Sequence, residues 1–221
     1  MIVLGLTGSI GMGKSTAAMT LRRLGVPLFD ADRMVHRLLA PGGAAVEPVA
    51  AAFPGVRAAN GGIDRGLLGQ RVFSDPAALF RLERIIHPMV EAGERRFLGL
   101  CRGRRAPIVA LDIPLLFESG SERRCDYVVV VSAPGLIQRQ RVLGRPGVSE
   151  GRLAAILKNQ MPDRTKRERA DFVVSTGLSR NLSRRRLRAI VRSLRAGRPE
   201  IGRGTRSSLK REPLKRRRRR N

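Results

Sequence analysis

The stretch GSIGMGKST combines glycines, a lysine and hydroxyl side chains at the spacing G-x-x-x-x-G-K-[ST]. Glycines at these positions let successive backbone N–H groups converge on phosphate oxygens, while Lys14 adds a positive charge near the β- and γ-phosphates. Ser15 is a candidate ligand for Mg²⁺, and the following helix N-terminus adds a favourable dipole. The motif predicts an ATP site made of Gly8, Ser9, Ile10, Gly11, Met12, Gly13, Lys14, Ser15 and Thr16.

The residues around this loop predict the local structure that a phosphate site needs. Residues 2–6 form a short apolar run typical of a buried strand, and the chain from Ala17 onward has the pattern of an amphipathic helix. The glycines therefore fall where a strand turns into a helix, as the motif requires. The alternative interpretation is a glycine-rich turn that binds no ligand.

Three aspartates are candidates for the chemistry on the acceptor side. Phosphoryl transfer needs a carboxylate that can take the proton of an attacking hydroxyl, and we expect Asp32 to be that base. We expect Asp30 to support the metal, hydrogen-bond the loop or cap the next helix, and plain capping is the alternative for both residues. Asp112 ends a β-rich run and is expected to hold Mg²⁺ directly or through water, unless it is only a turn residue before Pro114.

Histidines and arginines supply further candidates. His87 precedes Pro88 in an apolar helix, where a phosphate-binding residue and a packed core histidine fit the pattern equally well. His36 is expected to be structural or exposed, and neither histidine has partners at metal-ligand spacing. Arg141 and Arg145 lie one helical turn apart and could grip ATP phosphates from one face, because guanidinium is planar and always charged.

Apolar runs along the chain predict an α/β fold with a five-stranded parallel sheet. The runs alternate with helical or loop segments, which is typical of a parallel sheet with helices on both faces, as in a P-loop kinase core. Ligands bind at the carboxyl ends of such strands, where the phosphate loop, Asp32 and Asp112 all fall. The five predicted strands are residues 2–6, 26–29, 107–111, 127–131 and 172–174.

Two segments outside the predicted sheet are expected to cover the site. Between residues 41 and 105 the alternation gives way to a glycine-rich loop over 54–63 and a helix that we expect to bend at Pro88, because proline interrupts the hydrogen-bond ladder. We interpret this segment as a helical substrate-binding insertion. Residues 133–170 are predicted to form two or three arginine-rich helices that close over the triphosphate as a lid.

Length and composition indicate a folded cytoplasmic protein. The 221 residues, 42% of them hydrophobic, suffice for a domain that we place at residues 1–197. No apolar run approaches about 20 residues and the N-terminus lacks the pattern of a signal peptide, so we expect no membrane contact and no export. Cys101 and Cys125 are isolated thiols without metal-ligand spacing.

The net charge of +26 predicts attraction to polyanions, including nucleotides, cofactor phosphates and nucleic acid. Composition bias together with a basic tail is the simpler explanation. The tail, residues 198–221, has eleven Lys or Arg residues against two Glu, which is unable to bury a core, so we predict that it is disordered. It is expected to be a solvated segment, with adhesion to nucleic acid or a membrane surface as the alternative.

Taken together, these residues resemble the dephospho-coenzyme A kinase family. A phosphate loop alone is shared by many ATPases and kinases, whereas the ordered series with HP and DIPLLFE is specific. The resemblance covers roughly residues 1–196. It is carried by LTGSIGMGKST at the start, DADRMVHRLL from Asp30, IDRGLLGQRVF from Ile63, IIHPMV from Ile85, DIPLLFESG from Asp112, DYVVVVSAP from Asp126 and the spacing Gln160…Lys166…Ala170-Asp171.

The resemblance implies transfer of the γ-phosphoryl group of ATP to the ribose 3′-hydroxyl of dephospho-coenzyme A, the last step of coenzyme A biosynthesis. It also implies a three-layer P-loop kinase core, a helical coenzyme A domain and a lid. By position, Asp32 resembles the family's catalytic carboxylate, Lys14 its phosphate-loop lysine and Arg141 its lid arginine. The residues that resemble its acceptor-binding segments are Asp64, Arg65, His87, Pro88, Leu115, Leu116, Phe117 and Glu118.

Two other functions stay open on the residues alone. The same core serves many acceptors, so a kinase for another small metabolite, nucleoside or nucleotide is the first alternative. The charge and the tail motivate a nucleic-acid-binding ATPase, although only 4% of the residues are aromatic, which leaves little for base stacking. The oligomeric state is open as well.

Overall fold

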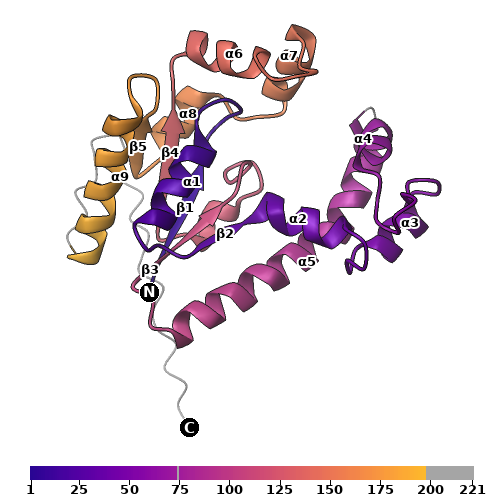
Figure 1. Ribbon diagram of the computed structural model, residues 1–221, viewed down its shortest axis with the longest axis horizontal. Coiled ribbons are helices and arrows are strands. Elements are labelled where there is room, and N and C mark those ends of the chain that lie inside the picture. Colours follow the sequence, from indigo (N-terminus) through magenta and orange to yellow (C-terminus); the bar gives the residue numbers. More distant parts are fainter. Residues whose placement is uncertain (74, 198–221) are drawn as a thin grey trace.

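A five-stranded parallel sheet forms the centre of the protein (Figure 1). The computed structural model describes residues 1–73 and 75–197. The strand order is β2-β3-β1-β4-β5, and each predicted strand is present within two residues of its expected bounds. The strands are β1 (Ile2–Thr7), β2 (Leu28–Asp30), β3 (Ile108–Asp112), β4 (Tyr127–Ser132) and β5 (Phe172–Ser175).

The register of the sheet brings the predicted acidic residues to one edge. Asp112 pairs with Leu6 of β1 on one side and with Asp30 of β2 on the other. Parallel strands all end at the same edge, so the residues that follow β1, β2 and β3 meet there. β4, with the sequence YVVVVS, is buried along almost its whole length, as expected of a central parallel strand covered on both faces.

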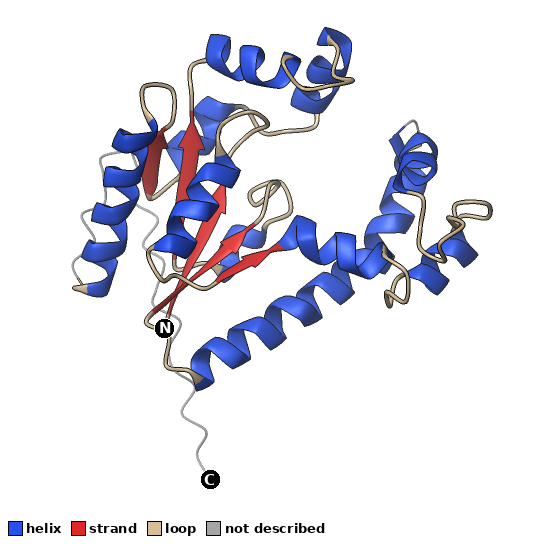
Figure 2. Cartoon of the chain, viewed as in Figure 1, coloured by secondary structure: helices blue, strands red, loops and turns tan. Residues whose placement is uncertain are grey.

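Helices cover both faces of the sheet, which confirms the predicted three-layer α/β core (Figure 2). On one face, α1 (Lys14–Arg23) and α9 (Arg180–Arg195) pack together. The other face is covered by the C-terminal part of α5 (Pro76–Gly103), by the segment that contains the short 3-10 helix η1 (Ser121–Arg124), and by the region of α8 (Asp163–Arg169). The buried residues of α9 recur on one helical face: Leu187, Ile190, Val191 and Leu194.

The segment predicted as an insertion, together with the helix that precedes it, builds a second apolar cluster beside the sheet (Figure 1). Its core includes the buried residues Val49, Phe53, Leu68 and Ile86. α5 continues through Pro88 as one helix, so this proline does not end it. The contributing helices are α2 (Ala31–Leu39), α3 (Val46–Ala52), α4 (Arg65–Phe73) and the first half of α5.

The segment predicted as a lid contains α6 (Gly135–Leu143), α7 (Glu150–Lys158) and α8, in agreement with the expected two or three helices. Within residues 1–73 and 75–197, every helix is too short or too polar to cross a bilayer. The predicted basic tail, residues 198–221, lies outside the described residues.

Candidate active site

The phosphate loop leaves the carboxyl end of β1 and enters α1. Gly11 and Gly13 have φ angles of 76° and 87°, in the left-handed region that favours glycine. A Cβ at Gly11 would lie 2.6 Å from Cγ2 of Val142, so α6 approaches the loop too closely for a side chain there. Gly13 caps α1 without a side chain, and the first N–H groups of the helix are left without an intrahelical acceptor, as an anion site requires.

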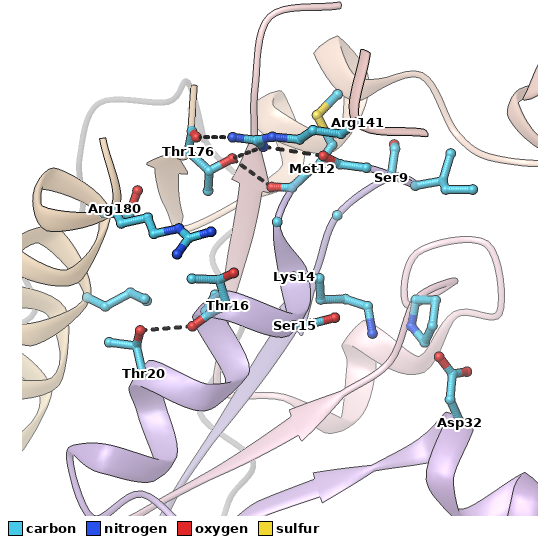
Figure 3. Close-up of a pocket in the computed structure, with 18 of the residues that line it drawn as sticks. Ser9, Met12, Lys14, Ser15, Thr16, Thr20, Asp32, Arg141, Thr176 and Arg180 are labelled. Carbon is cyan, nitrogen blue, oxygen red and sulfur yellow. Dashed lines mark hydrogen bonds between the residues drawn. The ribbon is translucent and has the colours of Figure 1, made fainter. Parts of the chain in front are cut away.

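A cavity of about 580 Å³ opens at this loop (Figure 3). It is lined by every residue from Gly8 to Thr16, together with Asp32, Arg141 and Arg145. The structure therefore brings all the predicted ATP-binding residues and the predicted base to one hollow. The lining residues that were not predicted as part of the site are Ala17, Thr20, Pro114, Gln160, Thr176, Arg180, Ser183 and Leu187.

Lys14, which lines the cavity, forms an ion pair with the buried Asp112. The Nζ atom of Lys14 lies 2.7 Å from Oδ1 of Asp112, and the two side chains are 18% and 5% exposed. Burial raises the pKa of the Asp112 carboxyl, and the nearby Asp30 and Asp32 charges raise it further, whereas Lys14 lowers it. Asp112 is thus a buried carboxylate whose charge depends on the phosphate-loop lysine.

The two aspartates that follow β2 have different surroundings. Asp30 is the N-cap of α2: its Oδ1 accepts a hydrogen bond of 2.9 Å from the N–H of Arg33, so the capping alternative applies to this residue. Asp30 also lies 3.6 Å from the guanidinium of Arg22. Asp32, in the first turn of α2, is exposed and points toward the cavity on the side where Lys14 ends (Figure 3).

The two predicted arginines reach the cavity from the segment after β4. Arg141 donates hydrogen bonds to the carbonyl oxygens of Gly11 at 3.3 Å and Thr176 at 2.7 Å (Figure 3). The expected placement of both arginines on one helix is wrong, because α6 ends at Leu143 and Arg145 lies in the turn beyond it. Both side chains nevertheless line the cavity.

Apart from Asp32, the residues expected to contact the acceptor lie outside this cavity. Asp64 caps α4, since its Oδ1 accepts from the N–H groups of Gly66 at 2.8 Å and Leu67 at 3.0 Å. Arg65 approaches Nδ1 of the exposed His36 at 3.0 Å. His87 and Pro88 are exposed on α5, so the interpretation of His87 as a packed core residue is wrong.

The segment from Leu115 to Glu118 is mainly held by packing. Leu116 and Phe117 are buried in the cluster that covers one face of the sheet. Glu118 accepts a hydrogen bond of 2.7 Å from the N–H of Met161 and forms an ion pair of 2.9 Å with the buried Lys166. Of this segment, Leu115 has the most exposed hydrophobic side chain, at 41%.

Three lining residues come from distant parts of the chain that no local motif connects to the phosphate loop. Thr176 follows β5, and its hydroxyl donates to the carbonyl oxygen of Met12 at 2.8 Å. Arg180 begins α9, and its guanidinium points into the cavity near Thr16 (Figure 3). Gln160 lies between α7 and α8. The spacing of Gln160 to Lys166 was one of the features of the family resemblance. No sequence pattern pointed to Thr176 or Arg180.

The residues at the site fit a magnesium ion that is held partly by phosphates. Ser15 lines the cavity and Asp112 supplies a buried carboxylate beside Lys14. Mg²⁺ commonly takes one or two carboxylate or hydroxyl oxygens and completes its shell with water and substrate phosphates. Among the described residues, no three His, Cys, Asp or Glu side chains gather into a metal cluster, so an all-protein cage is not the arrangement present there.

A sequence model of the family described as dephospho-CoA kinase matches residues 2–180 of this chain. The chain belongs to the dephospho-CoA kinase family. A protein of Paramagnetospirillum magneticum named dephospho-CoA kinase is 58% identical over 199 residues, which are 90% of this chain and 93% of that protein. A protein of the same name from Rhizobium meliloti is 54% identical over 197 residues, covering 89% of this chain and all of the relative.

The fold agrees with this assignment. The solved structure of dephospho-CoA kinase from Campylobacter jejuni has a TM-score of 0.66 and 25% identity to this chain, with 88% of this chain and 98% of that chain covered. The P-loop kinase fold and the ATP-dependent kinase class predicted from the sequence are therefore confirmed.

Proposed function

We propose that this dephospho-CoA kinase family member transfers the γ-phosphoryl group of ATP to the ribose 3′-hydroxyl of dephospho-coenzyme A, giving coenzyme A and ADP in the final step of coenzyme A biosynthesis. The family match over residues 2–180 carries this proposal and favours this acceptor over other metabolites and nucleosides. We place the reaction in the cytoplasm.

The phosphate loop binds the donor in this proposal. N–H groups at the start of α1 would receive the phosphate oxygens, and the Lys14 ammonium has three donor hydrogens, so it can contact a phosphate while keeping Asp112. Arg141 and Arg145 line the same cavity, where their charges would stabilise the negative charge that spreads over the transferred group.

Asp32 acts on the acceptor. Its exposed carboxylate, at the edge of the cavity that holds the loop, would orient the ribose hydroxyl and take its proton as the new bond forms. The acceptor would extend from there toward the helical insertion, where we place contacts with the residues that resemble the family's acceptor segments. These are Asp64, Arg65, His87, Pro88, Leu115, Leu116, Phe117 and Glu118.

Ser15 and Asp112 would hold Mg²⁺ together with the phosphates. When bound, the ion neutralises charge on the phosphate oxygens and aligns them for transfer. The contribution of the chain is to keep a carboxylate charged in a buried position, which the ion pair of Asp112 with Lys14 favours.

The test is direct conversion of the substrate. Purified protein is incubated with ATP, Mg²⁺ and dephospho-coenzyme A, and the product is examined by mass spectrometry that locates the added phosphoryl group. We expect a product phosphorylated on the ribose 3′-oxygen, with adenosine, nucleoside monophosphates and shikimate converted far more slowly. Absence of ATP-dependent conversion, phosphorylation at another position, or faster conversion of one of the other acceptors would contradict the proposal.

A further inference from the structure

Two glutamine side chains hold the same residue of the phosphate loop from different sides. The Nε2 atom of Gln138 donates a hydrogen bond of 2.8 Å to the carbonyl oxygen of Ile10. The Oε1 atom of Gln160 accepts a hydrogen bond of 3.0 Å from the N–H of Ile10. Both polar groups of this backbone position are therefore used by side chains that lie more than a hundred positions away in the sequence.

The chemistry of the partners fixes the orientation of both amides. A carbonyl oxygen can only accept and an N–H can only donate, so Gln138 must present its nitrogen and Gln160 its oxygen. Gln138 is buried on α6, with 9% of its surface exposed, and Gln160 is half-buried between α7 and α8. The two residues therefore flank the part of the chain that carries Arg141 and Arg145.

The contacts at Ile10 act next to the sharpest part of the loop. Gly11 follows directly in a left-handed conformation, and an added Cβ there would lie 3.0 Å from the backbone oxygen of Gln138. Because the N–H of Ile10 is already bonded to Gln160, the phosphate oxygens depend on N–H groups later in the loop. The direction of those groups depends on the backbone angles at Ile10 and Gly11, and a site that is fixed before binding loses less entropy when the ligand arrives.

We propose that Gln138 and Gln160 are positioning residues that hold the phosphate loop in its nucleotide-binding shape and connect it to the arginine-bearing segment between them. Neither glutamine needs to touch the nucleotide for this role. The kinetic tests of this proposal rest on the proposed function, because they need dephospho-coenzyme A as acceptor. The main test, the affinity for ADP, needs only nucleotide binding.

The experiment compares three single variants of the full chain and one double variant, which combines the changes at Gln138 and Gln160. Gln138→Met and Gln160→Met keep the length of the side chain and remove its hydrogen-bonding atoms. Gln140→Met is the matched control, because Gln140 is exposed on the same helix. The measurements are the Kd of ADP by calorimetry, KM and kcat for each substrate, the thermal midpoint, and amide hydrogen exchange of the loop peptide.

We expect each of the Gln138 and Gln160 variants to bind ADP about tenfold more weakly, the effect of one lost hydrogen bond that leaves a partly buried backbone group of Ile10 without that partner. KM for ATP should rise by a similar factor, KM for dephospho-coenzyme A should stay unchanged, and exchange of the loop amides should become faster. The double variant should lose less than the product of the single effects, because both side chains hold one residue. Gln140→Met should behave like the wild type.

A lower thermal midpoint with unchanged Kd for ADP in both single variants would overturn the proposal, since it would leave the glutamines a purely structural role. Should Gln138→Met fail to fold, the half-buried Gln160 provides the same test. The Kd of ADP requires no acceptor, so a wild type that binds ADP but does not phosphorylate dephospho-coenzyme A would refute the proposed function while the role of the glutamines could still be measured.

Discussion

The phosphate side and the acceptor side of this protein are built differently. The phosphate side is made by nine consecutive residues whose backbone forms the site, and all of them line one cavity. The residues predicted for the acceptor side are distributed over α4, α5 and the segment after β3, and several of them cap a helix or fill the core. A site made by backbone geometry is local in the sequence, whereas one made by side chains depends on how distant elements pack.

The largest expected effect concerns Asp32, where the two sides meet. Replacing Asp32 with Asn removes the proton acceptor, so kcat should fall by about 10²- to 10⁴-fold while the Kd of ADP is unchanged. Asp30→Asn is the matched control, because asparagine also caps helices and should preserve most activity. A kcat of Asp32→Asn close to that of the wild type would separate this carboxylate from the chemistry.

The next prediction tests whether the insertion can be destabilised without a change in nucleotide binding. Phe53 is buried in the apolar cluster of the insertion, and Phe53→Ala should lower the free energy of unfolding by about 3–5 kcal/mol. We expect KM for dephospho-coenzyme A to rise and the Kd of ADP to stay constant. Leu187→Ala offers the contrast, since Leu187 is buried in the sheet core and lines the cavity, so this variant should weaken ADP binding. For both variants, urea unfolding measures the free energy of unfolding and calorimetry measures the Kd of ADP. Weaker ADP binding by Phe53→Ala would show that the two sides are coupled.

Two glycine substitutions, one on the phosphate side and one on the acceptor side, are expected to have a smaller effect on stability. Gly11 and Gly42 both have left-handed backbone, with φ of 76° and 74°, so alanine at either position should destabilise the fold by about 1–2 kcal/mol. An alanine Cβ at Gly42 meets no atom within 4 Å, whereas at Gly11 it meets Val142 at 2.6 Å. Only Gly11→Ala should also weaken ADP binding. Equal losses of ADP affinity in the two variants would argue against a tight contact between α6 and the loop.

The smallest expected effect is a pH dependence of the free energy of unfolding, caused by a buried carboxyl on α5, the helix that joins the two sides. Glu94 on α5 is 3% exposed, and burial raises the pKa of its carboxyl above the usual 4.5, although Arg124 at 3.4 Å lowers it in part. At pH values between 4.5 and the raised pKa of Glu94, the folded protein binds more protons than the unfolded chain. The contribution of Glu94 to stability therefore falls as the pH rises above about 4.5.

Glu94→Gln cannot lose a proton, so the stability of this variant relative to the wild type should increase as the pH rises from below 4.5 toward neutrality. Urea unfolding across that range measures the difference. A difference that is independent of pH, or that changes in the opposite direction, would contradict the raised pKa.

The sequence was sufficient to predict the strands, the layers and the phosphate loop, because each of these depends on local pattern: an apolar run, a helical period or a glycine spacing. It also predicted that Asp32 would reach the loop, because the carboxyl ends of parallel strands share an edge. The placement of Arg145 on the helix of Arg141 failed, since a glycine at position 144 ends α6 first. Thr176 and Arg180 could not be found, because only the packing of β5 and α9 brings them to the cavity.

The length of α5 has a mechanical consequence, because this one helix contributes to two apolar clusters. Its 28 residues extend about 42 Å at the usual rise of an α-helix, with Cys101 near one end packed in the sheet core and Ile86 packed in the insertion. A stiff rod anchored at one end amplifies rotation, so a small change of tilt where Cys101 is seated would carry the outer end through several ångströms. Such a tilt would move the insertion relative to the sheet while both apolar clusters stay packed.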